Sequence, residues 1–277
     1  MRTNRKIWIL GLCLAAASAG ASNIDDYCPA AVSRFEQVLA HSGMEATIET
    51  AMLVLSNPGS TKEEKYWALP LIGCSENERY ASNLIAALAD PDWDVRGGAI
   101  IAMRYMRSES TFSSLIDIVT DEAEDEKIRQ IGTGVLSQIG GENVDVAWAI
   151  AGAAQDTSQN SGVRFNHVFS LGRLTSPQSV IELNAFLDDR DANVGAAAAV
   201  ALAKHGVRKS IPYLVQAIMS PTTAYWMKMK AVRELERLAN RDFEFADLGR
   251  PLVKEQYDAA QAEVCEWYEA NKQEFVQ

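Results

Sequence analysis

Side chains that could carry out catalysis or bind a metal are few in this sequence, and their spacing matches no known chemistry. The three histidines, His41, His167 and His205, are too far apart in sequence to form a helical pair of metal ligands. The sequence also has no Gly-x-Ser-x-Gly nucleophile motif and no glycine motif for binding phosphates or dinucleotides. We therefore predict no catalytic residue, no metal site and no cofactor.

One acidic stretch partly resembles a calcium-binding loop. Asp189, Asp191 and Asn193 occupy the first three ligand positions of an EF-hand loop. Such a loop also needs glycine at its sixth position and glutamate at its twelfth, where this sequence has Val194 and Val200. The pattern therefore favours a turn between two helices over a calcium site.

Three cysteines follow the N-terminal segment: Cys28, Cys74 and Cys265. In an oxidising compartment two of them could form a disulfide. We favour Cys28 with Cys74, because this bond would attach the N-terminal segment to the rest of the protein. The alternative, in which all three are small buried hydrophobic residues, stays open because connectivity cannot be read from sequence.

A pattern that recurs along the chain indicates which elements position these side chains. Each copy begins with an apolar residue, which we call its anchor. The residues 4, 8 and 11 positions after the anchor share one face of a helix with it, and most of them are apolar or small. Successive anchors lie 33, 35, 31 and 33 positions apart. The anchors are Val95, Ile128, Val163, Val194 and Met227.

A second helix is expected in each copy. Taking the anchor as zero, the positions 20 residues later are predicted to face the core. These positions hold Leu115, Trp148, Leu183 and Leu214. One helical hairpin cannot cover its own apolar face, so the copies are expected to stack into a solenoid.

The first helix of the first copy carries a family resemblance. The run from Asp90 to Arg96, followed by Ala99, resembles the signature of short, lyase-associated HEAT repeats. The resemblance covers about residues 80 to 240. It implies an all-α fold, a right-handed αα superhelix, with divergent helical caps at both ends.

In that family, the Asp and Arg side chains of the signature link neighbouring repeats. Arg96, Arg129 and Arg164 match the basic position, and Lys228 matches it in charge. Gly195 departs from it, which puts the link in doubt at the fourth copy. Residues 238–243 and 265–272 are similar to the end of some exported bacterial HEAT proteins, in which the final helix caps the array.

Four segments follow from these patterns. We predict a signal peptide over residues 1–21, an N-terminal helical cap over 22–89, HEAT-like repeats over 90–247 and a C-terminal capping helix over 248–277.

The first residues have the order of a secretory signal peptide. Arg2, Arg5 and Lys6 precede an apolar stretch over residues 7–17, and small residues follow it. The stretch is shorter than the roughly 20 residues that span a bilayer. The alternative is an amphipathic or buried N-terminal helix. We predict an exported protein, periplasmic or secreted, that is not inserted in the membrane after cleavage.

The charge of the chain argues against two classes of partner. The net charge is −11, and loss of the three basic residues of the signal segment would make it −14. A surface this acidic repels nucleic acid and anionic membranes, because both bind through Lys and Arg.

A partner surface is expected where second helices line the concave side of such a solenoid. The repeat register places a strip of side chains outward, apolar in its centre and polar at its ends, as is typical of partner sites. The residues of this strip are Asp117, Val146, Ile150, Ile181 and Gln216. A register displaced by one residue, with Ile150 and Ile181 in the core, fits the periodicity equally well.

Two functions remain from different classes. The first is an exported scaffold that binds a protein or peptide on its concave surface without catalysis. The second, implied by the resemblance, is a lyase-like enzyme that acts on a prosthetic group or its conjugate. The predicted export and the absence of a nucleophilic or acidic cluster favour the scaffold, although fold alone does not decide function.

Overall fold

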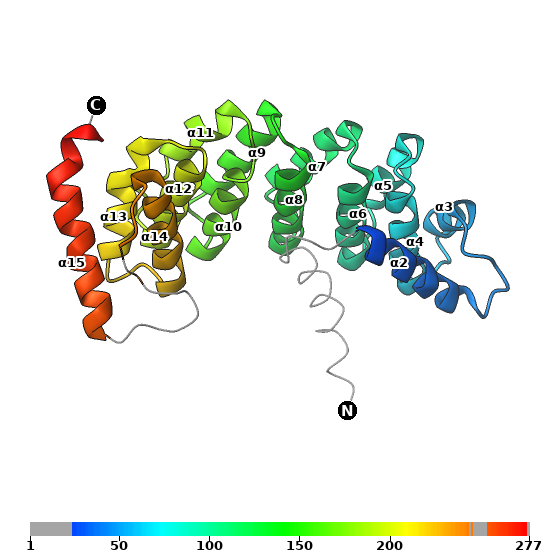
Figure 1. Cartoon of the computed structure of the whole chain (residues 1–277). Coiled ribbons are helices and arrows are strands. Elements are labelled where there is room, and N and C mark those ends of the chain that lie inside the picture. Colours follow the sequence, from blue (N-terminus) through cyan, green and yellow to red (C-terminus); the bar gives the residue numbers. More distant parts are fainter. Residues whose placement is uncertain (1–23, 244, 246–253, 276–277) are drawn as a thin grey trace. The chain divides into compact units, whose positions relative to one another are not determined.

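The computed structural model describes residues 24–243, 245 and 254–275, and all regular secondary structure in these residues is helical (Figure 1). The predicted all-α class is therefore confirmed. Within the described part of the chain, no helix combines the length and apolar character needed to cross a membrane. The predicted signal peptide, residues 1–21, lies outside the described residues.

The chain divides into two compact units between Ile139 and Gly140. This boundary falls between the two helices of the second predicted copy. The helices of the first unit are α2 (Ile24–Leu39), α3 (Ile48–Ser56), α4 (Lys62–Cys74), α5 (Ala81–Ala87), α6 (Trp93–Met106), α7 (Phe112–Thr120) and α8 (Glu126–Ile139), with 3₁₀ turns η1 (Glu78–Tyr80) and η2 (Glu109–Thr111). Those of the second are α9 (Val144–Gln155), α10 (Ser161–Leu171), α11 (Pro177–Asn184), α12 (Ala192–Lys204), α13 (Ile211–Met219), α14 (Tyr225–Ala239) and α15 (Lys254–Asn271), with η3 (Arg208–Ser210) and η4 (Lys272–Glu274).

Short polar side chains set where many of these helices begin. In each case a side-chain oxygen accepts a hydrogen bond from a backbone N–H of the first turn, which the helix itself leaves without a partner. Such a cap contributes about 1 kcal/mol to helix stability. The capping residues of α6, α9, α10, α11 and α12 are Asp92, Asn143, Asn160, Ser176 and Asp191.

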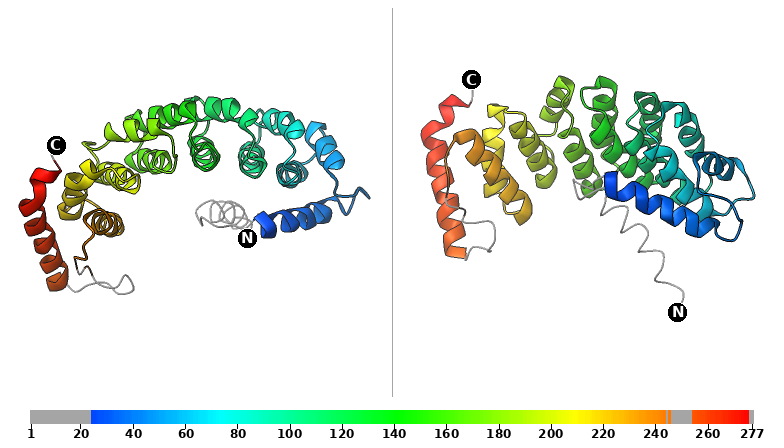
Figure 2. Two further views of the ribbon diagram at one scale, coloured as in Figure 1. Left: turned by 45° about the horizontal axis from the view of Figure 1, so that its top comes forward. Right: turned by 45° about the vertical axis from the view of Figure 1, so that its right-hand side comes forward.

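Each unit consists of two layers of helices. In the first unit, α4, α6 and α8 pack side by side, and α5 and α7 cover one side of this row. In the second unit, α10, α12 and α14 form the corresponding row, and α9, α11 and α13 pack against it (Figure 2). The predicted stacking of helical hairpins is therefore present within each unit.

The anchor residues form the core between the layers. Val95, Ile128, Val194 and Met227 are completely buried, and Val163 is nearly so. Burial of a side chain of this size contributes roughly 1.5–3 kcal/mol. Since each anchor is covered by helices of neighbouring hairpins, no hairpin is expected to be stable by itself.

The repeat begins one copy earlier than the sequence pattern indicates. α4, η1 and α5 have the same order as α6, η2 and α7. Lys65 of α4 takes the place of Arg96, and its Nζ lies 2.7 Å from Oδ2 of Asp90 in the following turn. Burial acts to raise the pKa of Asp90. Hydrogen bonds from Lys65 and from the Asp92 N–H, together with the positive charges of Lys65 and Arg96, have the opposite and larger effect, so the pKa of Asp90 is lowered. The segment predicted as a cap therefore already contains an inter-repeat ion pair.

Two of the three expected arginines link repeats in the same way, whereas Arg129 has no carboxylate partner within 4.0 Å among the described residues. Arg96 donates to both carboxylate oxygens of Glu124, at 2.9 and 2.7 Å. Arg164 forms a double hydrogen bond with the carboxylate of Asp189 and also donates to the carbonyl oxygen of Ala154 at 3.0 Å. The side chains of Arg164 and Asp189 are 4% and 8% exposed, so this pair is the most buried of the links.

The fourth copy uses a different link. A Cβ atom at Gly195 would lie 3.0 Å from the carbonyl oxygen of Leu187, so the start of α12 passes too close to the preceding turn for a side chain there. Asn193 supplies the connection instead, because its Oδ1 accepts a hydrogen bond of 2.8 Å from the backbone N–H of Ala224 in the next turn. The departure at Gly195 thus replaces an ion pair with an amide bridge.

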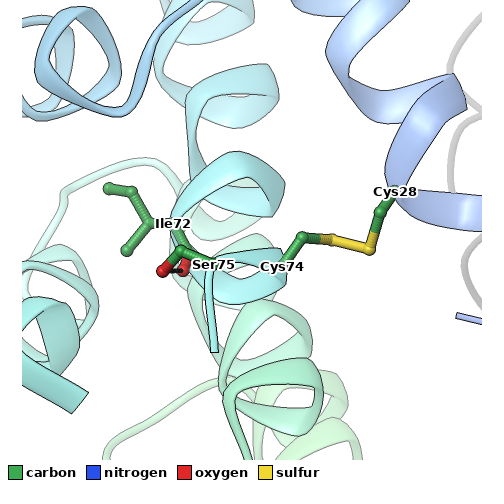
Figure 3. Close-up of a disulfide and its surroundings, with 4 residues drawn as sticks. All are labelled: Cys28, Ile72, Cys74 and Ser75. Carbon is green, nitrogen blue, oxygen red and sulfur yellow. Dashed lines mark hydrogen bonds between the residues drawn. A yellow bond between two sulfur atoms is a disulfide. The ribbon is translucent and has the colours of Figure 1, made fainter. Parts of the chain in front are cut away.

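The disulfide favoured by the sequence is present in the structure. The Sγ atoms of Cys28 and Cys74 are bonded, and their Cα atoms are 5.9 Å apart (Figure 3). The bond joins α2 to the end of α4, against which α2 packs with Phe35 and Leu39 completely buried. Cys265 is a half-buried free thiol of α15.

The final helix covers the end of the second unit. α15 packs against α13, with Val264 completely buried. The rings of Phe243 and Phe275 contact Trp267 at centroid distances of 5.2 and 5.6 Å. α15 lies within the segment predicted as a capping helix, residues 248–277, of which 248–253 and 276–277 lie outside the described residues.

The buried link at Arg164 yields the first prediction. Arg164→Met is expected to lower the free energy of unfolding by about 3 kcal/mol or more, because it leaves the Asp189 carboxylate buried without its partner. Urea denaturation followed by circular dichroism measures this loss. The control is Arg190→Met. The guanidinium of Arg190 is exposed and donates to the carbonyl oxygen of Thr157, so its loss is expected to lower the free energy of unfolding by less than about 1 kcal/mol. Equal losses in the two variants would contradict the structural role of the buried pair.

The disulfide yields the second prediction. The Cys28–Cys74 bond has a sequence separation of 46, so Cys74→Ser is expected to lower the free energy of unfolding by about 4 kcal/mol, through the added entropy of the unfolded chain. Cys265→Ser, which removes the free thiol, serves as the control. A reductant should destabilise the wild type and this control but leave Cys74→Ser unchanged. A wild type that does not respond to the reductant would argue against the bond.

Candidate partner-binding surface

Three of the five residues of the predicted strip are exposed. Ile181 of α11 is 62% exposed, and Asp117 of α7 and Gln216 of α13 also face solvent. Asp117 belongs to the first unit, whereas Ile181 and Gln216 belong to the second. Asp117 and Asp121 line a shallow pocket that also involves Ile85 and Ile118 of the first unit.

The other two residues were placed wrongly, because Val146 and Ile150 are completely buried. The sequence register also expected Trp148 in the core, but its side chain is 53% exposed. The residues of α9 that face the core include Val146, Ala147 and Ile150, so an offset of 20 residues from the anchor selects the exposed face of this helix.

The corrected register gives α9 an apolar outer face. Val144 and Trp148, one turn apart, are 39% and 53% exposed. Gly152, one turn further, is exposed, and a Cβ atom there would meet no neighbour within 4 Å, so nothing covers the indole from that side. α11, which carries Ile181, packs directly against α9. We call Val144, Trp148 and Ile181 the apolar strip.

The structure also brings together a group of side chains that the sequence analysis did not identify. Phe165 and Phe169 of α10 stack at a centroid distance of 6.1 Å, and Phe165 meets Trp226 of α14 edge to face at 5.3 Å. Lys230 of α14 lies over Phe169 and Trp226 at 4.6 and 5.3 Å, and Lys204 of α12 lies over Phe169 at 5.6 Å. We call these five residues the aromatic–lysine surface.

The alanine-rich helix α12 makes this arrangement possible. It packs between α10 and α14 and is buried from Val194 to Ala203. Because its side chains are small, rings from the two flanking helices can meet across it, as Phe165 and Trp226 do. The small side chains of α12 therefore bring the two halves of the surface together.

The cations of this surface repel one another. Burial lowers the pKa of Lys230, and the positive charges of Lys204 and Arg233 lower it further. Neither Lys204 nor Lys230 has an ion pair with any carboxylate among the described residues, whereas Lys62, Lys65 and the arginine links each do. Ring faces partly compensate, since a cation over an aromatic ring gains about 0.5–2 kcal/mol.

The residues that resembled a calcium loop have structural roles. Asp189 binds Arg164, Asp191 caps α12, and Asn193 accepts the N–H of Ala224. Burial acts to raise the pKa of Asp191, but hydrogen bonds from Ser161 and from the N–H groups of α12 outweigh it and lower this pKa. Within the described ranges, no group of three or more His, Cys, Asp or Glu side chains is arranged to hold a metal ion.

The corrected register yields the third prediction. Ile150→Asp is expected to destabilise the protein by at least about 4 kcal/mol, because it buries a charge in the core. Ile181→Asp, an equivalent change at an exposed position, should alter the free energy of unfolding by no more than about 0.5 kcal/mol. Chemical denaturation of both single variants distinguishes them. Unfolding caused by Ile181→Asp would contradict the exposure of that side chain.

Comparison with known proteins identifies part of the fold. Residues 146–236 match a family described as HEAT repeats, which confirms the resemblance over this segment of the second unit. No curated protein matches the chain.

Solved structures with a similar fold include proteins of different kinds. An engineered protein has 17% identity and a TM-score of 0.44, over 70% of this chain and 96% of its own. The complex of CpcE and CpcF of phycocyanin lyase from Nostoc sp. PCC7120 has 16% identity and a TM-score of 0.38, over 91% and 93%. Human deoxyhypusine hydroxylase, in complex with glycerol, has 15% identity and a TM-score of 0.30, over 93% and 99%.

Proposed function

We propose that this protein is an exported scaffold that binds a protein or peptide partner and catalyses no reaction. The observation that carries the proposal is the apolar strip on α9 and α11, where Trp148 and Ile181 are 53% and 62% exposed. The sequence predicted a partner site on these helices, and the exposure of Trp148, in place of the buried Val146 and Ile150, supports this proposal.

The strip has the properties of a protein contact. Large apolar side chains exposed together are unusual on a protein that stays alone in solution. Tryptophan is also among the residues that most often dominate the binding energy of interfaces. Each Å² of apolar surface that a partner covers contributes about 25 cal/mol before the costs of association. Val144 is exposed one turn from Trp148 on α9, and Ile181 is exposed on the neighbouring helix α11, so we propose that one partner helix or strand contacts all three side chains.

Structural roles of the polar residues support binding rather than catalysis. The acidic groups that the sequence singled out hold the repeats together, as Asp189 does for Arg164 and Asp191 does for α12. A carboxylate engaged in this way is not available as a general base or a nucleophile. The HEAT repeats of residues 146–236 are built from the same elements that present the strip.

The disulfide supports the proposal of export. Bonds such as Cys28–Cys74 persist in oxidising compartments and are rare in the cytosol. The N-terminal sequence, with Arg2, Arg5 and Lys6 before an apolar stretch, has the order of a leader that directs a chain to such a compartment.

The fourth prediction tests the binding function. The tagged wild-type protein is used to capture partners from the envelope of its own cells, and the captured proteins are identified by mass spectrometry. Trp148→Glu with Ile181→Asp should reduce recovery of a specific partner by at least about tenfold, because both changes place charge in an apolar contact. The matched control, Met44→Asp with Leu53→Asp, changes two exposed apolar residues of the first unit and should leave recovery unchanged.

Two results would contradict the proposal. Equal recovery of the partner by the strip variant and the wild type, with both folded by circular dichroism, would exclude the strip as the contact. A coloured or conjugated prosthetic group that co-purifies with the wild type and is turned over would favour the lyase-like function instead.

A further inference from the structure

We propose that the aromatic–lysine surface is a second binding site, which takes an acidic peptide segment of a partner protein. Carboxylates of the peptide pair with Lys204 and Lys230, and its apolar side chains lie against Phe169 and Trp226. This site is on α10, α12 and α14, the row of helices opposite to the one that carries the apolar strip in the second unit.

Charge on the surface points to an anionic ligand. Seven positively charged side chains elsewhere have carboxylate partners within 4.0 Å in the described part of the chain. They are Lys62, Lys65, Arg96, Arg164, Arg237, Arg241 and Lys272. Lys204 and Lys230 have ring faces in place of carboxylates. An anion beside these two lysines would reduce the repulsion between them, which, together with the larger effect of burial, lowers the pKa of Lys230.

The aromatic rings point to a ligand with apolar groups beside its charges. Trp226 is 49% exposed, and Phe165 and Phe169 are half-buried, so the surface has an apolar component that small anions would not use. The ring of Phe165 contacts those of Trp226 and Phe169, at centroid distances of 5.3 and 6.1 Å. An extended peptide that carries acidic and apolar side chains on the same face matches both components, because residues two positions apart point to the same side and can reach both lysines and rings.

The acidity of the whole chain favours a short peptide over nucleic acid. A net charge of −11 repels a long polyanion at distance, whereas a short acidic segment bound in direct contact interacts mainly with the local lysines. At about 0.15 M ionic strength, charges more than about 8 Å away are largely screened. The local surface therefore decides which short ligands bind.

The fifth prediction tests this site with a defined probe. The probe is a fluorescein-labelled nonapeptide of three Glu-Leu-Glu units, and binding to the full protein is measured by fluorescence anisotropy at about 0.15 M ionic strength. Lys204→Gln with Lys230→Gln should raise the dissociation constant at least about tenfold, and Trp226→Ala should also weaken binding.

Matched controls separate the site from the general charge of the protein. Lys127→Gln with Lys209→Gln removes two exposed positive charges elsewhere and should change the dissociation constant by less than about twofold. A peptide with glutamine in place of every glutamate should bind the wild type at least about tenfold more weakly. The Trp148→Glu, Ile181→Asp variant should bind the acidic peptide as tightly as the wild type does. The proposal for this site and the proposal for the apolar strip can therefore be contradicted independently of each other.

Each of four results would overturn the proposal. The wild type could show no measurable binding of the acidic peptide. It could bind the glutamine peptide as tightly as the acidic one. The two double lysine variants could lose binding to the same extent. A labelled oligothymidylate could bind the wild type more tightly than the peptide does and bind the Lys204→Gln, Lys230→Gln variant more weakly. That result would identify the site as one for nucleic acid.

Discussion

Each helical hairpin of this chain has an apolar face that only the neighbouring hairpin can cover, and the rest of the structure depends on this constraint. The completely buried anchors, among them Val95 and Val194, lie where adjacent hairpins meet. The hairpins must approach at a fixed distance to exclude water from these residues. At Gly195 the approach is so close that a side chain has no room. Packing therefore comes first, and the polar links adapt to it.

The inter-repeat links show how polar groups are fitted to this packing. Where space allows, a cation of one repeat reaches a carboxylate in the turn before the next, as Lys65 and Arg164 do. Where α12 passes too close, Asn193 bridges to a backbone N–H instead. Buried ion pairs contribute little net stability compared with apolar packing, but removal of one partner is costly. The links therefore favour one register between neighbouring repeats over alternatives that would leave a charge buried alone.

Much of this fold could be predicted because its periodicity is strong. Anchors that recur every thirty-odd residues identified the helices from α6 to α14, and the need to cover apolar faces predicted their stacking. The repeat that includes Lys65 was missed, because its first helix holds Glu64 and Lys65 where the next copy holds the recognisable pair Val95 and Arg96. The pairing of Cys28 with Cys74 could only be favoured, since sequence does not determine which cysteines lie close together.

The candidate sites were harder to predict for two different physical reasons. On α9, the core face was misassigned because the offset from the anchor that holds for the other copies does not hold there, and a displacement of one or two residues in a helix moves a side chain from one face to another. Trp148 was therefore expected in the core although it is exposed. On α10 and α14, Phe165 and Trp226 are 61 positions apart in sequence, and their contact depends on the small side chains of the helix between them. No local periodicity reports a contact of this kind.

The same architecture explains how one unit can carry two surfaces of different chemistry. In a repeat array, each helix contacts only its near neighbours, so outward-facing residues on one row are not needed for packing on the other. The row of α9 and α11 presents apolar side chains, and the row of α10 and α14 presents lysines over aromatic rings. Substitutions on the two rows should have additive effects on stability, because the altered side chains share no partners. A repeat protein can therefore change what it binds on one row while the anchors, the links and the other row stay as they are.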